Sequence, residues 1–280
     1  MNKKELLTEL EKLGMRPGRG LGQNFLLDGN LLDRIVRLGE FEPGARILEV
    51  GPGFGALTRR LLAAGAQICA IEFDHRIAEY LRHEVSDPAL ELIEGDACRI
   101  DLSTLFGGAD YRIIANLPYA ISSVFIAKVL ELDQLPDRMV FMLQREMAER
   151  LAAAPGTKAY GALSVRTQFF YRLKIEKIVP PEVFYPPPEV ESAVLTLSLR
   201  GEFPGDPAIR KRLASLARLL FSQRRKQVGK VLGGAYGRDR AATALAKCGL
   251  PPEIRPDRID IAKFAALAAA LDGDTDLKNP

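Results

Sequence analysis

The sequence has little of what disulfide frameworks, metal centres and membrane spans require. Its three cysteines, Cys69, Cys98 and Cys248, are odd in number and lie far apart without C-x-x-C spacing. This pattern favours neither a disulfide framework nor a zinc site, so we expect no metal. No apolar run reaches the ~18 residues that cross a bilayer, and the charged start does not resemble a secretory signal. We therefore expect a cytoplasmic protein without a membrane partner.

Histidine is also scarce, since the chain contains only His75 and His83. Both fall in a helix-like stretch among charged neighbours, which is typical of surface residues. The sequence therefore offers neither a well-placed histidine base nor an activated cysteine, and we assign no general base.

The length and composition allow a large hydrophobic core. A chain of 280 residues with 47% hydrophobic composition can form one large domain and a smaller one. The segment Gly201–Pro207 is a linker by composition, and several short helices are expected after it, in residues 208–269. We therefore predict domains at residues 1–200 and 201–280.

Strand-like apolar runs alternate with helical patterns in the first domain. The predicted strands are residues 45–50, 67–71, 90–94, 111–115, 139–143, 171–179 and 192–199. The last two lie too close together for a helical crossover, so they should form an antiparallel pair at one sheet edge. The pattern predicts an α/β fold, a doubly wound Rossmann-like sheet with an antiparallel last strand, followed by a small all-α carboxyl-terminal domain.

The tetrapeptide Asn116-Leu117-Pro118-Tyr119 follows the fourth predicted strand. The Asn116 side-chain oxygen can accept a hydrogen bond from the exocyclic amine of adenine or cytosine, and the Leu117 or Pro118 carbonyl can accept a second. Tyr119 can stack on the ring. An ordinary strand-ending turn is the alternative, because Asn and Pro are common turn residues.

The first three predicted strands each end in residues suited to a nucleoside cofactor. Gly51 and Gly53 open a turn that lets a ligand approach the backbone at the start of a helix. Glu72, about twenty residues further on, can bind both ribose hydroxyls. Asp96, followed by Ala97, can accept from an adenine amine, although a helix cap or turn would explain it equally well.

This pattern leaves two enzyme classes open. Gly51, Gly53 and Ala56 also satisfy the G-x-G-x-x-(G/A) fingerprint of NAD enzymes. Dinucleotide dehydrogenase sheets usually lack the antiparallel edge pair, and this edge, together with the Asn116–Tyr119 tetrapeptide, favours methyl transfer over hydride transfer.

Five motifs in order closely resemble those of the ribosomal RNA adenine dimethyltransferases, which use S-adenosylmethionine. These motifs are Gly22–Leu26, Gly51–Thr58, Asn116–Tyr119, the F-x-P-x-P-x-V-x-S pattern from Phe184 to Ser192, and the basic signature Phe221–Lys226. The resemblance implies dimethylation of adenosine amines in small-subunit ribosomal RNA. It also implies that S-adenosylmethionine is contacted by Asn24, Leu26, Gly51, Gly53, Glu72, Asp96, Ala97 and Asn116.

Phe184 would hold the target base together with the Asn116–Tyr119 tetrapeptide. The segment Pro180–Pro188 contains five prolines, which favours a stiff polyproline-like loop that would fix this ring in place. The alternative is a rigid connector with Phe184 tucked into the core.

Positive charge is concentrated in one segment of the chain. Between Pro207 and Arg240 ten Lys or Arg residues face one acid, so this segment carries +9 and the remainder −6. A polyanion should therefore bind one face. We expect Arg224, Arg225, Lys226 and Lys230 to contact RNA, in the small ribosomal subunit or a pre-ribosomal particle, and we expect a monomer.

Three related functions remain open at this point. A non-catalytic RNA-binding ribosome-assembly factor could keep the same fold, although intact Glu72, Asp96 and Asn116 argue against it. Adenine methyltransferases of DNA or of large-subunit ribosomal RNA would share the same base clamp. The carboxyl-terminal resemblance favours small-subunit RNA.

Overall fold

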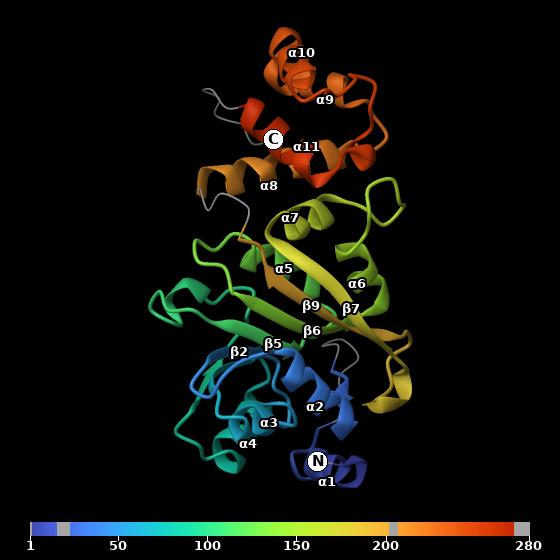
Figure 1. The fold of residues 1–280 in the computed structure, drawn as a ribbon. Coiled ribbons are helices and arrows are strands. Elements are labelled where there is room, and N and C mark those ends of the chain that lie inside the picture. Colours follow the sequence, from blue (N-terminus) through green and yellow to red (C-terminus); the bar gives the residue numbers. More distant parts are fainter. Residues whose placement is uncertain (1, 16–22, 202–206, 272–280) are drawn as a thin grey trace. The chain divides into compact units, whose positions relative to one another are not determined.

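The computed structural model describes residues 2–15, 23–201 and 207–271 (Figure 1). Contacts between residues divide the chain into two units, residues 1–148 with 173–199 and residues 149–172 with 200–280. The second unit thus takes in residues 149–172 besides the segment after the predicted linker. Residues 202–206 of the predicted linker lie outside the described residues, and the predicted boundary between the two domains at residue 200 stays a prediction.

The first unit is built on a seven-stranded sheet with the order β4-β3-β2-β5-β6-β9-β7. The strands are β2 (Arg46–Val50), β3 (Gln67–Glu72), β4 (Leu90–Glu94), β5 (Arg112–Asn116), β6 (Arg138–Gln144), β7 (Tyr171–Val179) and β9 (Ser192–Leu199). β2 to β6 pair in parallel, and β9 runs antiparallel to β6. The doubly wound sheet with an antiparallel last strand is therefore confirmed.

Helices cover the two faces of this sheet. Those of the first unit are α1 (Lys3–Lys12), α2 (Gly29–Leu38), α3 (Thr58–Ala63), α4 (His75–Glu84) and α5 (Ser122–Val129), and α6 (Arg145–Leu151) follows β6. Leu32 and Leu61, from α2 and α3, pack on one face in a cluster with Ile47 and Val140. α5 covers the opposite face, because alternate residues of a strand point to opposite sides and Phe125 meets Phe141 edge to face.

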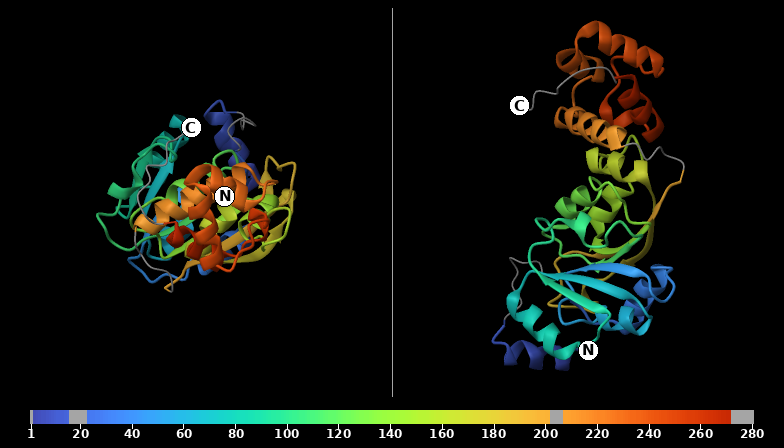
Figure 2. Two further views of the ribbon diagram at one scale, coloured as in Figure 1. Left: turned by 90° about the horizontal axis from the view of Figure 1, so that it is seen from above. Right: turned by 90° about the vertical axis from the view of Figure 1, so that its left-hand side faces the viewer.

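The amino-terminal helix α1 packs beside α4 (Figure 2, right). Its buried residues Leu6 and Leu10 share a hydrophobic cluster with Ile77 and Leu81 of α4 and with Phe54 of the glycine turn. An Asn2 capping box fixes the first turn of α1, since Asn2 and Glu5 each accept from the other's backbone N–H. α1 is therefore anchored directly beside the carboxyl edge of the sheet.

The proline-rich segment differs from the stiff polyproline-like loop that its composition predicts. It contains a 3-10 turn (Pro181–Val183), a two-residue strand β8 (Phe184–Tyr185) and a cis peptide bond before Pro186. β8 pairs antiparallel with β1 (Phe25–Leu26). This segment is therefore held in place by its pairing with β1, in addition to the stiffness of its prolines.

The second unit is helical. It contains α7 (Ala162–Phe170), α8 (Pro207–Ser222), α9 (Val228–Tyr236), α10 (Arg238–Lys247) and α11 (Ile261–Ala270). At its centre the ring of Phe221 stacks on Phe264 and meets Tyr160 edge to face, with 5.9 Å between the ring centroids in each pair. The Tyr160 hydroxyl donates to the Ile259 carbonyl at 2.9 Å, so the polar group of this buried tyrosine has a hydrogen-bond partner.

Among the described residues, every helix is too short or too polar to cross a membrane. The same residues contain no group of three or more His, Cys, Asp or Glu side chains that could hold a metal ion.

Candidate active site

A cavity of about 310 Å³ lies at the carboxyl ends of the parallel strands. Its walls come from the glycine turn after β2, from the ends of β3, β4 and β5, and from β1 and Leu6 of α1. Four acidic side chains line it, Glu49, Glu72, Asp74 and Asp96, and no Lys, Arg or His is found among the described lining residues. This excess of negative charge favours a cationic ligand.

Two glycines of the turn are required by their neighbours as well as by their backbone angles. Gly51 and Gly53 have φ values of +69° and +55°, which favour glycine. A Cβ on Gly51 would lie 3.0 Å from Pro118, and one on Gly53 would lie 3.1 Å from Phe25. The missing side chains therefore allow the glycine turn to pack closely against the tetrapeptide after β5 and against β1.

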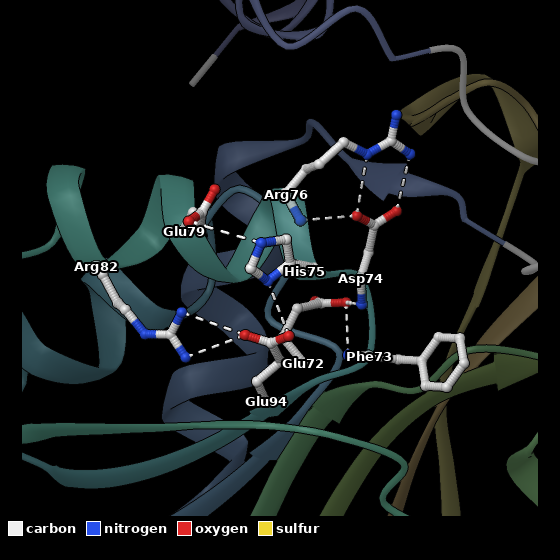
Figure 3. A network of polar contacts seen from close by, with 8 residues as sticks. All are labelled: Glu72, Phe73, Asp74, His75, Arg76, Glu79, Arg82 and Glu94. Atoms are coloured by element: carbon white, nitrogen blue, oxygen red, sulfur yellow. Dashed lines mark hydrogen bonds and ion pairs between the residues drawn. The ribbon is translucent and has the colours of Figure 1, made fainter.

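Glu72 forms a buried wall of the cavity, with 6% of its surface exposed. Its carboxylate accepts from the backbone N–H groups of Phe73 and Asp74, both at 2.9 Å (Figure 3), and from that of Gly53 at 3.2 Å. Burial raises the pKa of Glu72, and these backbone donors oppose the rise. The donors also fix the orientation of the carboxylate, so it is preorganised to receive a ligand's hydroxyl groups.

Figure 3 also shows two contacts that tie the helix after Glu72 to β4. Asp74 caps α4 through the backbone N–H of Arg76 at 3.0 Å. His75, at the start of α4, contacts Glu94 at 2.9 Å, and Arg82 pairs with the same carboxylate at 3.3 Å. These contacts hold the end of β4, and with it the turn that follows. His75 and His83 are both exposed, in agreement with their predicted surface position.

Asp96 caps the turn after β4 and also lines the cavity, and its contact with an adenine amine stays a prediction. Its carboxylate accepts from the Cys98 backbone N–H at 2.8 Å, as a turn-capping residue does, and it also lines the cavity. The next residue, Ala97, is buried in the cavity wall, and its carbonyl accepts from Lys128 at 3.1 Å. The turn after β4 is thereby fixed against α5.

Asn116 lies at the end of β5 and lines the cavity. Its Nδ2 donates to the backbone carbonyl of Asn24 at 3.0 Å. Because a carbonyl can only accept, this contact determines which way the amide faces, and the side-chain oxygen is presented as an acceptor. Asn24 and Leu26 line the same cavity, so β1 and β5 meet there.

The rest of the tetrapeptide is held by backbone and side-chain contacts. Leu117 donates its N–H to the Met142 carbonyl at 3.2 Å. The Pro118 carbonyl accepts from the Ile121 N–H at 3.2 Å and from the Ser122 hydroxyl at 3.0 Å, so both of its lone pairs are engaged.

Tyr119 lines the cavity, and its hydroxyl lies 2.5 Å from Oγ of Ser192 at the start of β9. Burial raises the pKa of the Tyr119 hydroxyl, so this group is a neutral hydrogen-bonding partner. The contact joins residues 73 positions apart and fixes the plane of the ring.

Phe184 is the one predicted base-binding residue that does not line this cavity. Only 3% of its surface is exposed, and it packs in the hydrophobic cluster that contains Leu26 and Leu32. This position matches the alternative considered for Phe184, a ring tucked into the core. Stacking on a target base remains a prediction for this residue.

A model of one protein family matches nearly the whole chain. The family described as ribosomal RNA adenine dimethylase matches residues 17–272. The chain belongs to this family. The family, the fold and the dimethyltransferase activity predicted from the motifs are thereby confirmed.

Individual relatives of the dimethylase family agree with this assignment. The chain is 41% identical to a ribosomal RNA small subunit methyltransferase A from Geobacter metallireducens, over 92% of this chain and 96% of the relative. A dimethyladenosine transferase from Plasmodium falciparum superposes with a TM-score of 0.72 at 25% identity, covering 87% of this chain and 95% of that one. The 23S rRNA methyltransferase ErmE superposes with a TM-score of 0.67 at 27% identity, covering 89% of this chain and 100% of that one.

The basic residues expected to contact RNA are not equivalent in this dimethylase. Arg225, Lys226 and Lys230 are exposed on the helical unit. Arg224 instead donates to the carbonyls of Lys158 and Thr157, at 2.7 and 3.1 Å. The sequence does not distinguish these four charges, whereas in the structure one side chain binds two carbonyls of another segment and the other three residues are exposed.

Glu49 belongs to the site although its sequence position did not suggest this. This carboxyl group is 1% exposed, lines the cavity and follows Leu48 in β2. An acid inside an otherwise apolar strand was the available signal, because buried carboxyl groups are rare without a function. The amino-terminal motif begins at Gly22, which lies outside the described residues.

Proposed function

We propose that this protein transfers methyl groups from S-adenosylmethionine to the exocyclic amines of two adjacent adenosines. These adenosines lie in a loop near the 3′ end of small-subunit ribosomal RNA. The observation that carries the proposal is the position of Asn116, which lines the acidic cavity beside the glycine turn while its Nδ2 donates to the Asn24 carbonyl, so that the amide oxygen is left to accept. Relatives at about 40% identity are named for the small ribosomal subunit, which favours this substrate over large-subunit RNA.

The lining residues fit this methyl donor. Gly51 and Gly53 leave room beside the backbone, Glu72 offers a fixed carboxylate to ribose hydroxyls, and Asp96 can accept from the adenine amine. Asn24, Leu26 and Ala97 complete the wall. S-Adenosylmethionine supplies a methyl group made electrophilic by its sulfonium, a positive charge that the Glu72, Asp74 and Asp96 carboxylates of the cavity favour.

The tetrapeptide would hold the target amine in line with that methyl group. The Asn116 oxygen accepts one hydrogen of the amine, and the Leu117 carbonyl accepts the other, because the Pro118 carbonyl is already engaged by α5. Two acceptors favour a pyramidal nitrogen and free its lone pair for attack. The lost proton passes to water, so these residues act by binding and orientation.

Stacking and charge would supply the affinity for RNA. Extruding a base from its stack costs a few kcal/mol, least in an unpaired loop. Tyr119 can return ~1 to 3 kcal/mol of this by stacking, with its ring held by Ser192. Phosphate contacts from Arg225, Lys226 and Lys230 would provide most of the remaining affinity.

The decisive experiment incubates the protein with labelled S-adenosylmethionine and unmodified small ribosomal subunits and maps the labelled nucleotides. We expect two methyl groups on each of two neighbouring adenosines. Asn116→Ala should lower the rate by about 100- to 1,000-fold while RNA binding is retained, because one preorganised contact is worth ~2.7 to 4 kcal/mol. Wild-type turnover in this variant would refute the clamp. Binding to subunits without any turnover by the wild-type protein would favour an assembly factor.

A further inference from the structure

Three segments of the helical unit meet around the basic signature. The loop 154–160 connects α6 to α7, and its Gly156 N–H donates to the Asp257 carbonyl at 2.6 Å. Gly156 has a φ of +90°, and a Cβ there would lie 3.2 Å from Nη1 of Arg258. The loop therefore packs directly against residues 257 and 258, so a residue with a side chain at position 156 would disturb both.

Arg224 joins this loop to the basic signature. Nη1 of its guanidinium donates to the Lys158 carbonyl at 2.7 Å, and Nη2 donates to the Thr157 carbonyl at 3.1 Å. The same guanidinium lies 3.8 Å from the Asp257 carboxylate. Two successive loop carbonyls are thus held by one planar group, which is the fixed fork geometry that arginine offers and lysine does not.

These contacts make Arg224 a poor phosphate ligand. Its donors point at the loop, and the neighbouring carboxylate of Asp257 would repel an approaching phosphate. Oδ1 of Asp257 is buried and has no hydrogen-bond partner among the described residues. The Arg224 guanidinium therefore binds groups of the protein itself.

The loop carries a lysine to the same surface. Lys158 is exposed, as are Arg225, Lys226 and Arg258. Arg224 binds the carbonyl of Lys158 and directly precedes Arg225 in the chain, so these exposed charges gather in one part of the helical unit. We call Lys158, Arg225, Lys226 and Arg258 the basic surface.

We propose that Arg224 is a positioning residue that holds the loop 154–160 in place, so that Lys158 joins Arg225, Lys226 and Arg258 in binding the phosphate backbone of the RNA substrate. The proposal rests on the function proposed above. It adds a phosphate contact from a loop outside the basic signature, and it removes Arg224 from the set of phosphate contacts.

The test measures RNA affinity against salt concentration, with a labelled small-subunit RNA fragment and the full-length protein. Each phosphate contact contributes about 0.7 to 0.9 to the slope of log affinity against log salt. We expect Lys158→Ala and Arg225→Ala each to reduce the slope by about this amount. Lys247→Ala, which removes an exposed lysine of α10 outside these three segments, is the matched control and should leave the slope unchanged.

The role of Arg224 is separated by a double variant. When Lys158→Ala is already present, adding Arg224→Ala should change the slope by less than 0.3, because Arg224 acts through the loop. Hydrogen exchange at residues 156–160 should rise at least tenfold in Arg224→Ala and stay at the wild-type rate in Arg225→Ala. The proposal would be overturned if adding Arg224→Ala to Lys158→Ala reduced the salt slope by a further 0.7 to 0.9, the contribution of about one phosphate contact. It would also be overturned if hydrogen exchange at residues 156–160 in Arg224→Ala stayed at the wild-type rate.

Hydrogen exchange also separates this proposal from the proposed function. If the wild-type protein fails to bind the RNA, the proposed function fails whatever the exchange shows. If it binds and methylates but Lys158→Ala keeps the wild-type slope, only the extended basic surface is wrong.

Discussion

The buried carboxyl group of Glu49 gives the sharpest prediction about pH. Its surface is 1% exposed, and its Oε2 and the Thr58 hydroxyl both lack a hydrogen-bond partner among the described residues. Burial, with a smaller contribution from the negative charge of Glu72, raises the pKa of Glu49 to about 8, and the nearby Thr58 hydroxyl only partly opposes this. Near neutral pH the group is therefore protonated in the folded protein.

The sign and size of the effect on stability follow from this shift. Below pH 4.5, the ordinary value, Glu49 is protonated in both the folded and the unfolded chain and has no effect. Between pH 4.5 and about 8 only the unfolded chain ionises, so the free energy of unfolding falls by ~1.4 kcal/mol for each pH unit. Between pH 5 and 7.5 this amounts to about 3 kcal/mol.

Glu49→Gln keeps the shape of the side chain and removes its titration. We expect the variant to gain about 3 kcal/mol relative to the wild type when the pH rises from 5 to 7.5, measured by urea unfolding without ligand. The control is Glu79→Gln on α4, whose side chain is 59% exposed and should behave like the wild type. Parallel pH profiles for wild type and Glu49→Gln would refute the assignment of a neutral buried carboxyl group.

Three further predictions concern the site and the RNA surface. Gly51→Ala should weaken S-adenosylmethionine binding at least tenfold in calorimetry, because its Cβ would lie 3.0 Å from Pro118 at a φ of +69°; wild-type affinity would show that the turn can adjust. Ser192→Ala and Tyr119→Phe should reduce kcat/KM by similar factors and without additivity, since both remove one hydrogen bond; additive losses would contradict a shared role. RNA affinity should fall with salt at a slope of about −4 to −5, for about six phosphate contacts, and a flat response would argue against the basic segment as the binding face.

Most elements of the sheet could be predicted from sequence because their signal is local. The predicted strands 90–94, 171–179 and 192–199 agree with β4, β7 and β9 at both ends. The pair β1 and β8 was missed, because two-residue strands are too short to show any periodicity. This pairing matters for the site, since it brings Leu26 to the cavity.

The candidate site was predictable in outline but not in its details. Gly51, Glu72, Asp96 and Asn116 line one cavity because each lies at or just after the end of a parallel strand of the same sheet, and parallel strands end at one edge. Phe184 illustrates the limit. An aromatic residue in a proline-rich segment is compatible with an exposed stacking ring and with a core residue, and spacing along the chain does not show that Phe184 packs in the cluster with Leu26.

The amino-acid sequence by itself determined most of the strands and their succession along the chain, the residue types at their carboxyl ends and the concentration of positive charge near the carboxyl terminus. These features depend on neighbouring residues and on total charge, which are properties of the chain alone. Only the tertiary structure decided that the Pro118 carbonyl is engaged, that Ser192 holds Tyr119 and that Arg224 faces the protein. Such contacts depend on which directions hydrogen-bonding groups point after distant segments have packed, and spacing along the chain does not encode those directions.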